Sequence, residues 1–342
     1  MDSLNFEGWC PIRIYPQENG LAVDWLKLGD AVLRAPFFKE DIDRLMALPF
    51  HQAFRRQSTL DQLLAWVQSS PGLPPSGFVF HVSRCGSTLV AQALAALRGA
   101  IVLSEPPLLD TLLQARSWPG QTATRQRSAL RALLSAMGQP YGRAQGPLRT
   151  RQWVKLDAWH VFEAPQIQHA WPDAPWVFVY RNPVEVLASQ MRQRGVFLIP
   201  GAVEANPSGL PLEAALRMPV AEYCARTLGR IYQSMVEQYR PGTLLVNYES
   251  LPHALLDSVL PHLGWHPDAE DRDAIQALSL RSAKRPTEDF VPDAQHKREQ
   301  AGETLQALAE TWIQPHFAQL EAWRLGGTQA GPATQPSEEF SA

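Results

Sequence analysis

The sequence predicts an α/β fold of three layers, with a central parallel sheet of about five strands between two layers of helices. Short apolar runs alternate with longer amphipathic segments, which is the order that βαβ units produce. The clearest run, 176–180, is apolar without alternation, as a parallel strand covered on both faces requires. The predicted strands are 78–82, 101–103, 153–156, 176–180 and 244–246, and a helix is predicted over 87–97.

Residues 1–75 are predicted to form an N-terminal α+β elaboration. A hairpin with strands at 12–15 and 23–28 opens it, across Glu18-Asn19-Gly20, and helical segments follow. The proline-rich stretch 71–75 then acts as a stiff break, because proline and glycine punctuate the chain.

Residues 76–325 are predicted to form the main α/β domain. Within it, the glycine- and proline-rich stretch 195–211 is predicted to be a loop insertion that covers a site. Residues 326–342 lack apolar content and are predicted to be a disordered tail. Parallel sheets bind ligands at the carboxyl ends of their strands, so the residues that directly follow each apolar run are the candidates for function.

Charge and composition exclude several classes of protein. The chain has 342 residues, 45% of them apolar and 19% charged, which is ordinary for a globular protein. Its net charge of −3 excludes a general polyanion binder, so any anion site must be local. The sequence shows no basic face and no RNP-like or zinc-finger motif, and we expect no nucleic-acid partner.

The three cysteines are widely spaced and form no CxxC pair, which argues for a reducing compartment, the cytoplasm. The first residues carry acidic side chains and no apolar core run, so we expect no signal peptide. We expect no membrane span, because no stretch approaches the roughly 20 apolar residues that one needs. The histidines are irregularly spaced, and we expect no metal site.

The loop between the first predicted strand and the first helix is a candidate anion site. Gly86 lets the backbone turn tightly and approach a ligand, and the free N–H groups at the helix start favour an anion. It is no Walker A loop, because Ser87 and not a lysine follows the glycine. The alternative is that Ser87 or Thr88 only caps the helix and that Arg84 is a surface charge. The candidate residues are Ser83, Arg84, Cys85, Gly86, Ser87, Thr88 and Leu89.

A second basic side chain follows the fourth predicted strand. Arg181 comes directly after the buried run 176–180, and Ser189 lies eight residues further along the chain. At the carboxyl edge of the sheet Arg181 can reach a second anion. The alternative is a salt bridge across the sheet edge.

These two segments together resemble the sulfotransferases. SRCGSTLVAQAL is similar to their 5′-phosphosulfate loop, and VFVYRNPVEVLASQ to the segment in which an arginine and a serine eight residues downstream clamp the 3′-phosphate. LLVNYESL resembles the segment of their last core strand, and the resemblance covers roughly residues 76–300. It implies a P-loop-type fold, 3′-phosphoadenosine 5′-phosphosulfate as the donor, and in-line transfer without a metal to a hydroxyl or amine.

Cys85 departs from the family pattern, which has serine or threonine at this place. The backbone N–H donors of the loop are unaffected by this change, but the contact that a serine or threonine hydroxyl would make is lost. Since the thiol follows an arginine near a helix N-terminus, we expect a lowered pKa and sensitivity to oxidation.

Sulfuryl transfer needs positive charge for the leaving group and a base for the acceptor's proton. Arg84 and Lys155 are the candidates for the charge; the family places a catalytic lysine at the end of its third strand, and snorkelling is the alternative for Lys155. Glu105 and Asp157 compete as the base, and the resemblance favours Glu105. A turn carboxylate is the alternative for either.

Two histidines are secondary candidates. His81 lies within a strand and is expected to be a core residue, whereas His160 could serve only if its helix turns it inward. Lys297 and Arg298 lie in a late basic stretch and are further candidates for the nucleotide site, with a solvated face as the alternative.

The sequence is also compatible with two other functions: a kinase-like phosphotransferase that uses ATP and Mg²⁺, with Asp157 as the metal ligand, and a nucleotide-binding protein without catalysis. No motif in the sequence identifies the acceptor, which can be a small molecule or a peptide. It also leaves open whether the chain is a monomer or a homodimer.

Overall fold

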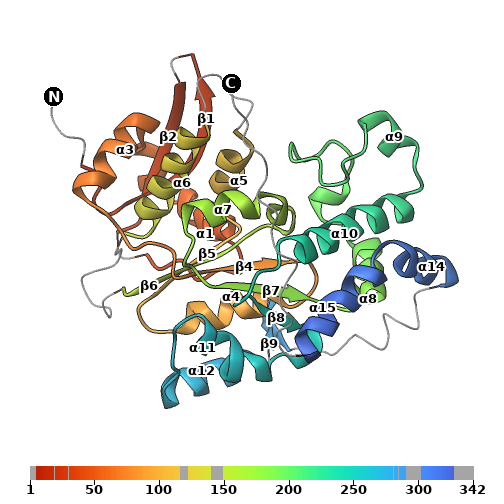
Figure 1. The fold of residues 1–342 in the computed structure, drawn as a ribbon. Helices are drawn as coiled ribbons and strands as arrows, with labels where there is room; N and C mark the ends of the chain where they lie inside the picture. The colour runs from red at the N-terminus through yellow and green to blue at the C-terminus, as the bar shows by residue number, and fades with distance from the viewer. Residues whose placement is uncertain are drawn as a thin grey trace.

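A five-stranded parallel sheet lies at the centre of the computed structural model (Figure 1). The structure describes residues 5–18, 20–29, 31–115, 122–139, 149–279, 281–283, 285–289 and 302–326. The strands are β4 (Gly77–His81), β5 (Ala100–Ser104), β6 (Arg151–Lys155), β7 (Trp176–Tyr180) and β8 (Leu244–Asn247). Each overlaps one of the predicted strands, and the predicted fold class is confirmed.

The strand order is β5-β6-β4-β7-β8, so β4 lies in the middle of the sheet. In the register, Val79 of β4 lies opposite Lys155 of β6 on one side and Val177 of β7 on the other. Because all neighbouring pairs are parallel, the carboxyl ends of the strands meet at one edge. The side chains of β4 and β7 are buried along their whole length, as a sheet covered on both faces requires.

Helices cover both faces of the sheet, with α4 and α12 below it and α6 and α7 above it in Figure 1. A further group, α8, α10, α14 and α15, packs together beside β7 and β8. The bounds are α4 (Ser87–Ala96), α5 (Pro107–Gln114), α6 (Ala123–Met137), α7 (Ala164–Ala170), α8 (Pro183–Arg192), α9 (Leu212–Arg217), α10 (Val220–Glu237), α11 (Leu260–His262), α12 (Ala269–Ser279), α14 (Glu303–Trp312) and α15 (Gln314–Gly326).

Short elements complete the described part of the chain. They are the 3₁₀ helices η2 (Ala158–Glu163), η3 (Val196–Leu198) and η4 (Tyr248–Ser250), the π-helix η5 (Leu255–Val259), and a pair of strands, β9 (Arg281–Ser282) and β10 (Arg285–Asp289). Asn182 caps α8 by accepting from two backbone N–H groups, and Pro183 occupies the first helical position, as its fixed φ allows.

The N-terminal region contains the predicted hairpin, as β1 (Trp9–Gln17) and β2 (Gly20–Lys27). A third strand, β3 (Arg56–Thr59), which the sequence did not predict, pairs with β2, and the helices are α1 (Phe38–Met46), α2 (Pro49–Ala53) and α3 (Leu60–Ser69). β1 packs on α5 and α6, and α3 packs on α6. The buried residues of this region belong to the same core as the central sheet. A domain boundary at residue 75 remains a prediction.

The stretch 195–211 begins with η3 and continues as turns beside α10 (Figure 1). Lys297, Arg298 and residues 327–342 of the predicted tail lie outside the described residues, whereas Gly326 ends α15. In the part of the chain that the structure describes, no helix has the length and apolar character that crossing a membrane requires.

Candidate active site

The loop after β4 has an unusual backbone. Ser83 and Arg84 have φ angles of 66° and 53°, in the left-handed region, and Gly86 follows with 86°. Such angles are strained for residues other than glycine and gather at functional sites. Gly86 is the N-cap of α4, and within the described residues no side chain caps this helix. The first N–H groups of α4 therefore face the loop, and Ser87 and Thr88 are helical residues and not caps.

Gly86 is also held in a close contact. A Cβ atom at this position would lie 2.8 Å from Cδ1 of Leu251 and 2.9 Å from Cδ2 of Tyr248. No side chain fits there without a shift of these neighbours. The glycine thus lets the loop fold tightly over the start of the helix, as an anion cradle requires.

The loop is tied to α8 by two hydrogen bonds. Nη2 of Arg84 donates to the backbone oxygen of Gln193 at 2.7 Å, and Nε2 of Gln190 donates to Oγ of Ser83 at 3.0 Å. Burial, and secondly the nearby charge of Arg192, lower the pKa of the Arg84 guanidinium. The side chain of Arg84 therefore extends from the loop to the C-terminal end of α8.

The expectation of a lowered pKa at Cys85 is wrong. Its thiol is fully buried, and Sγ donates to the backbone oxygen of Val179 at 3.1 Å. Burial raises the pKa of this thiol, and hydrogen bonds with the loop backbone oppose the rise only in part. Proximity to a helix N-terminus suggested a lowered pKa, but desolvation of the thiolate outweighs it.

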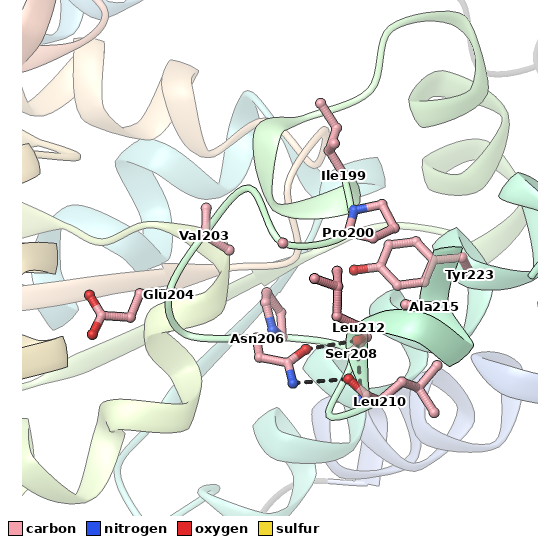
Figure 2. A pocket seen from close by; sticks show the side chains of 12 residues that line it. Ile199, Pro200, Val203, Glu204, Asn206, Ser208, Leu210, Leu212, Ala215 and Tyr223 are labelled. Carbon is pink, nitrogen blue, oxygen red and sulfur yellow. Dashed lines mark hydrogen bonds between the residues drawn. The ribbon is translucent and has the colours of Figure 1, made fainter. Parts of the chain in front are cut away.

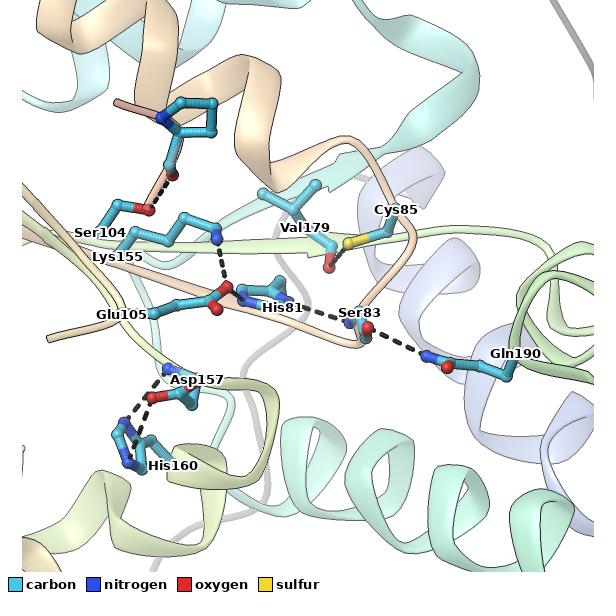
Figure 3. Close-up of polar contacts among 11 residues, drawn as sticks. His81, Ser83, Cys85, Ser104, Glu105, Lys155, Asp157, His160, Val179 and Gln190 are labelled. Carbon is cyan, nitrogen blue, oxygen red and sulfur yellow. Dashed lines mark hydrogen bonds and ion pairs between the residues drawn. The ribbon is translucent and has the colours of Figure 1, made fainter. Parts of the chain in front are cut away.

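Three polar side chains from three strands meet beside the loop (Figure 3). Nζ of Lys155, at the end of β6, forms an ion pair with Oε1 of Glu105, which follows β5. Nε2 of His81, at the end of β4, lies 3.2 Å from the same oxygen. Nδ1 of His81 accepts the backbone N–H of Ser83 at 2.9 Å, so Nε2 carries the proton and donates to Glu105. Lys155 is 1% exposed and buried in a pair, which excludes the snorkelling alternative.

This arrangement fixes the charge of Glu105. Burial disfavours the carboxylate, but Lys155 and His81 outweigh burial and hold the pKa of Glu105 well below its ordinary range. Burial in turn lowers the pKa of His81 and keeps the ring neutral. Glu105 has a φ of 52°, a further strained residue in the site. A carboxylate with so low a pKa is a weak proton acceptor.

Asp157 has the opposite environment. Burial first, and the charges of Glu105 and Asp110 next, raise the pKa of Asp157 to about 7, against the opposing effects of His160 and Lys155. Its side chain is 13% exposed, and Nε2 of His160 lies 3.8 Å from Oδ2. A carboxyl group with a pKa near neutral is suited to accept a proton at physiological pH.

His160 is turned inward and fully buried, so it meets the condition that the sequence analysis set for a role in the site. Its Nε2 lies 2.8 Å from Oδ1 of Asp110, which also accepts Nε1 of Trp159 at 2.7 Å. Burial opposes the charged ring, but the Asp110 hydrogen bond and the Asp157 charge raise the pKa of His160. The backbone N–H of Asp157 donates to Nδ1 of His160 at 3.2 Å, so the ring lies between the Asp110 carboxylate and the backbone of Asp157.

Arg181 is buried at the end of β7, with 3% of its surface exposed. Its Nε donates to Oε2 of Glu185 at 2.5 Å, its guanidinium stacks 3.8 Å from the ring centroid of Tyr248, and its Nη1 donates to the backbone oxygen of Arg84 at 3.4 Å. Arg181 thus forms a salt bridge, but with Glu185 in the helix that follows it and not across the sheet edge. The Arg181 side chain also contacts the anion loop through Arg84. Ser189 is buried in α8, the helix that begins two residues after Arg181.

The N-terminal region also reaches this edge of the sheet. The ring of Phe37 lies 5.0 Å from Nζ of Lys155, and the backbone oxygen of Pro36 accepts Oγ of Ser104 at 2.7 Å. The segment before α1 therefore covers the buried lysine.

The structure thus brings the predicted residues after β4, β5, β6 and β7 to one edge. Sequence reasoning missed Asp110 and Gln190. Asp110 lies in α5 and Gln190 beside Ser189 in α8, and no spacing or motif distinguished either one.

No protein-family model matches the chain, and no curated protein matches it in sequence. Solved structures align with it at low identity. A sulfotransferase from Alicyclobacillus acidocaldarius is 14% identical with a TM-score of 0.41, over 74% of this chain and 96% of its own. The sulfotransferase domain from the curacin biosynthetic pathway is 16% identical with a TM-score of 0.44, over 73% and 98%. Sulfotransferase STF9 from Mycobacterium avium is 14% identical with a TM-score of 0.43, over 79% and 82%. We infer function from the residues of the site itself.

Proposed function

We propose that the protein is a sulfotransferase, which moves a sulfuryl group from 3′-phosphoadenosine 5′-phosphosulfate to a hydroxyl or amine by in-line transfer. The observation that carries the proposal is the edge of the sheet, where a glycine-capped helix start, a buried lysine and two unlike carboxylates meet. Phosphoryl and sulfuryl transfer both require alignment and charge stabilisation more than covalent catalysis. The missing Walker lysine disfavours a nucleoside triphosphate.

The donor's 5′-phosphosulfate fits the loop of Ser83 to Leu89. The tight approach at Gly86 and the N–H groups of α4 favour an anion, and they do not depend on the side chain of Cys85. The 3′-phosphate fits Arg181 and Ser189. Glu185 and Tyr248 hold the Arg181 guanidinium in one orientation, and a guanidinium has five donors to share among partners. Lys297 and Arg298 are proposed as further contacts on sequence grounds alone.

Lys155 and Arg84 are the proposed sources of positive charge. As the bond between sulfur and the bridging oxygen breaks, negative charge develops on the departing 5′-phosphate. Lys155 is fixed for this task because its ammonium group is buried and paired with Glu105. Glu105 then has a positioning role: it holds the lysine and is itself oriented by His81.

Asp157 is the proposed base. The acceptor's O–H or N–H bond breaks as its oxygen or nitrogen bonds to sulfur, and the proton passes to the Asp157 carboxylate. The products are the sulfated acceptor and adenosine 3′,5′-bisphosphate. The resemblance favoured Glu105 for this role, but the strong ion pair of Glu105 and the raised pKa of Asp157 support the other assignment.

The test is transfer itself. The purified chain is incubated with the phosphosulfate donor, a panel of hydroxyl and amine acceptors, and a chelator, and release of adenosine 3′,5′-bisphosphate is measured. We expect acceptor-dependent release that the chelator does not reduce. Formation of ADP from ATP that requires Mg²⁺, without any sulfated product, would instead identify a phosphotransferase. Binding of the bisphosphate without turnover on any acceptor would indicate a protein without catalysis.

A further inference from the structure

A hollow of about 220 Å³ lies in the stretch that follows α8 (Figure 2). It is formed by residues 199–215 and by Tyr223 of α10, and most of its wall is apolar. Ile199 and Leu212, which both line it, are 44% and 52% exposed. Large apolar side chains grouped at an open hollow are typical of a binding site for an apolar group.

One tyrosine hydroxyl faces this hollow. Tyr223 is 3% exposed, and Figure 2 shows its hydroxyl among the lining side chains. Among the described residues this hydroxyl has no hydrogen-bond partner. The oxygen is not one of the buried side-chain atoms that lack a partner among the described residues, so it is accessible from the open space of the hollow. A hydroxyl left in this way beside an apolar wall fits a ligand with an apolar body and a polar substituent.

The segment 193–197, which leads into the hollow, contacts the candidate active site at three points. Gln193, where the stretch begins, accepts Arg84 of the anion loop at 2.7 Å. The backbone N–H of Gly195 donates to Gln190, the residue that also donates to Ser83. The ring of Phe197 in η3 lies 5.7 Å from the ring of Trp159, which is two residues after Asp157. The hollow therefore directly follows, along the chain, a segment that contacts the donor loop and the ring of Trp159.

The volume limits the occupant. A cavity of about 150 Å³ holds one benzene ring, so 220 Å³ has room for a body of up to about two rings. We infer that this hollow binds the apolar body of the acceptor, and that the acceptor class is an alcohol or amine on a compact one- or two-ring apolar body. The inference rests on the proposed function for the reaction, but the binding itself can be measured without turnover.

The experiment uses naphthalen-2-ol as a two-ring probe, titrated into the full chain by calorimetry with saturating adenosine 3′,5′-bisphosphate. Leu212→Asn changes a lining residue that is half exposed, so the fold should tolerate it. Leu216→Asn is the matched control: it lies one turn further on α9, is 66% exposed, and does not line the hollow. We expect Leu212→Asn to weaken binding of the probe about tenfold, the effect of losing part of an apolar contact, and Leu216→Asn to leave it unchanged.

A second pair of probes tests Tyr223. Naphthalene-2,6-diol adds a hydroxyl at the far end of the same body, and we expect it to bind more tightly than naphthalen-2-ol. In Tyr223→Phe this advantage should disappear, while affinity for naphthalen-2-ol stays within about twofold. An unchanged advantage of the diol in the variant would show that Tyr223 does not contact the ligand.

The outcomes separate the two proposals. Equal affinities of the probe for Leu212→Asn and Leu216→Asn, with normal bisphosphate binding, would overturn the acceptor site and leave the sulfotransferase proposal standing. Failure of the bisphosphate to bind would overturn the proposed function. A loss of probe affinity confined to Leu212→Asn would then still support an apolar site at this place.

Discussion

The pH dependence of kcat/KM distinguishes the two carboxylates. If Asp157 takes the acceptor's proton, the reaction needs its ionised form, and the pKa of Asp157 is raised to about 7. Below that pH the ionised fraction falls about tenfold for each pH unit. We therefore expect kcat/KM to be about a hundredfold lower at pH 5 than at its plateau above pH 8.

Glu105 would give a different profile. Lys155 and His81, against the effect of burial, hold the pKa of Glu105 far below the range of the experiment. If Glu105 were the base, its own ionisation would cause no change in rate between pH 5 and pH 8. Burial opposes the charged form of His160, but the hydrogen bond with Asp110 and the charge of Asp157 raise its pKa, so His160 is a second titrating group beside Asp157 and the profile must be compared between variants.

The assay is the initial rate of donor consumption from pH 5 to 8.5, at low acceptor concentration, in the wild type, Asp157→Asn and Glu105→Gln. Asp157→Asn should lose about 10²-fold or more of the plateau rate, the usual size of a lost general base, and the rise with pH should disappear. The affinity for adenosine 3′,5′-bisphosphate, measured in parallel, should be unchanged. A variant Asp157→Asn with near-normal turnover and the same rise with pH would refute the assignment.

Three further predictions follow from contacts of the site. Glu105→Gln removes the charge partner of Lys155, which is 1% exposed, so the free energy of unfolding in urea should fall by about 3–5 kcal/mol; a variant as stable as the wild type would contradict the ion pair. Arg181→Ala should weaken binding of adenosine 3′,5′-bisphosphate, measured by calorimetry, by about tenfold or more, since hydrogen bonds to a charged group contribute about 1.5–3 kcal/mol, and unchanged affinity would remove Arg181 from the donor site. Cys85 is fully buried with a raised pKa, so a thiol reagent should label it in urea but not in the native chain; rapid native labelling, located at Cys85 by peptide mapping, would show that the loop opens.

Much of the fold could be predicted because its signals are local. A short apolar run rich in β-branched and aromatic residues, such as 176–180, predicts a buried strand from local sequence, and the turn after each strand is then expected at one edge of a parallel sheet. That reasoning placed Gly86, Lys155 and Arg181 at the same edge. β3 was missed, because Arg56–Thr59 is short and polar, and its pairing with β2 depends on the hairpin next to it.

The properties of the site residues could not be predicted, because they depend on contacts between distant parts of the chain. Glu105 and Lys155 are 50 residues apart, as are Asp110 and His160, and these pairs set the charges of the site. For Cys85 the local signals, a helix start and an arginine, indicated the wrong direction of the pKa shift. Burial under the neighbouring strand decides it, and burial is a property of the fold.

The central claim is that the edge of the sheet binds a nucleotide with a 3′-phosphate. Calorimetric titration of the wild-type chain with adenosine 3′,5′-bisphosphate and with ADP, in the same buffer with and without Mg²⁺, tests it most directly. We predict that the bisphosphate binds at least about tenfold more tightly than ADP, a difference of about 1.4 kcal/mol or more, and that Mg²⁺ does not change this order. Equal affinities, or tighter binding of ADP with Mg²⁺, would contradict the claim.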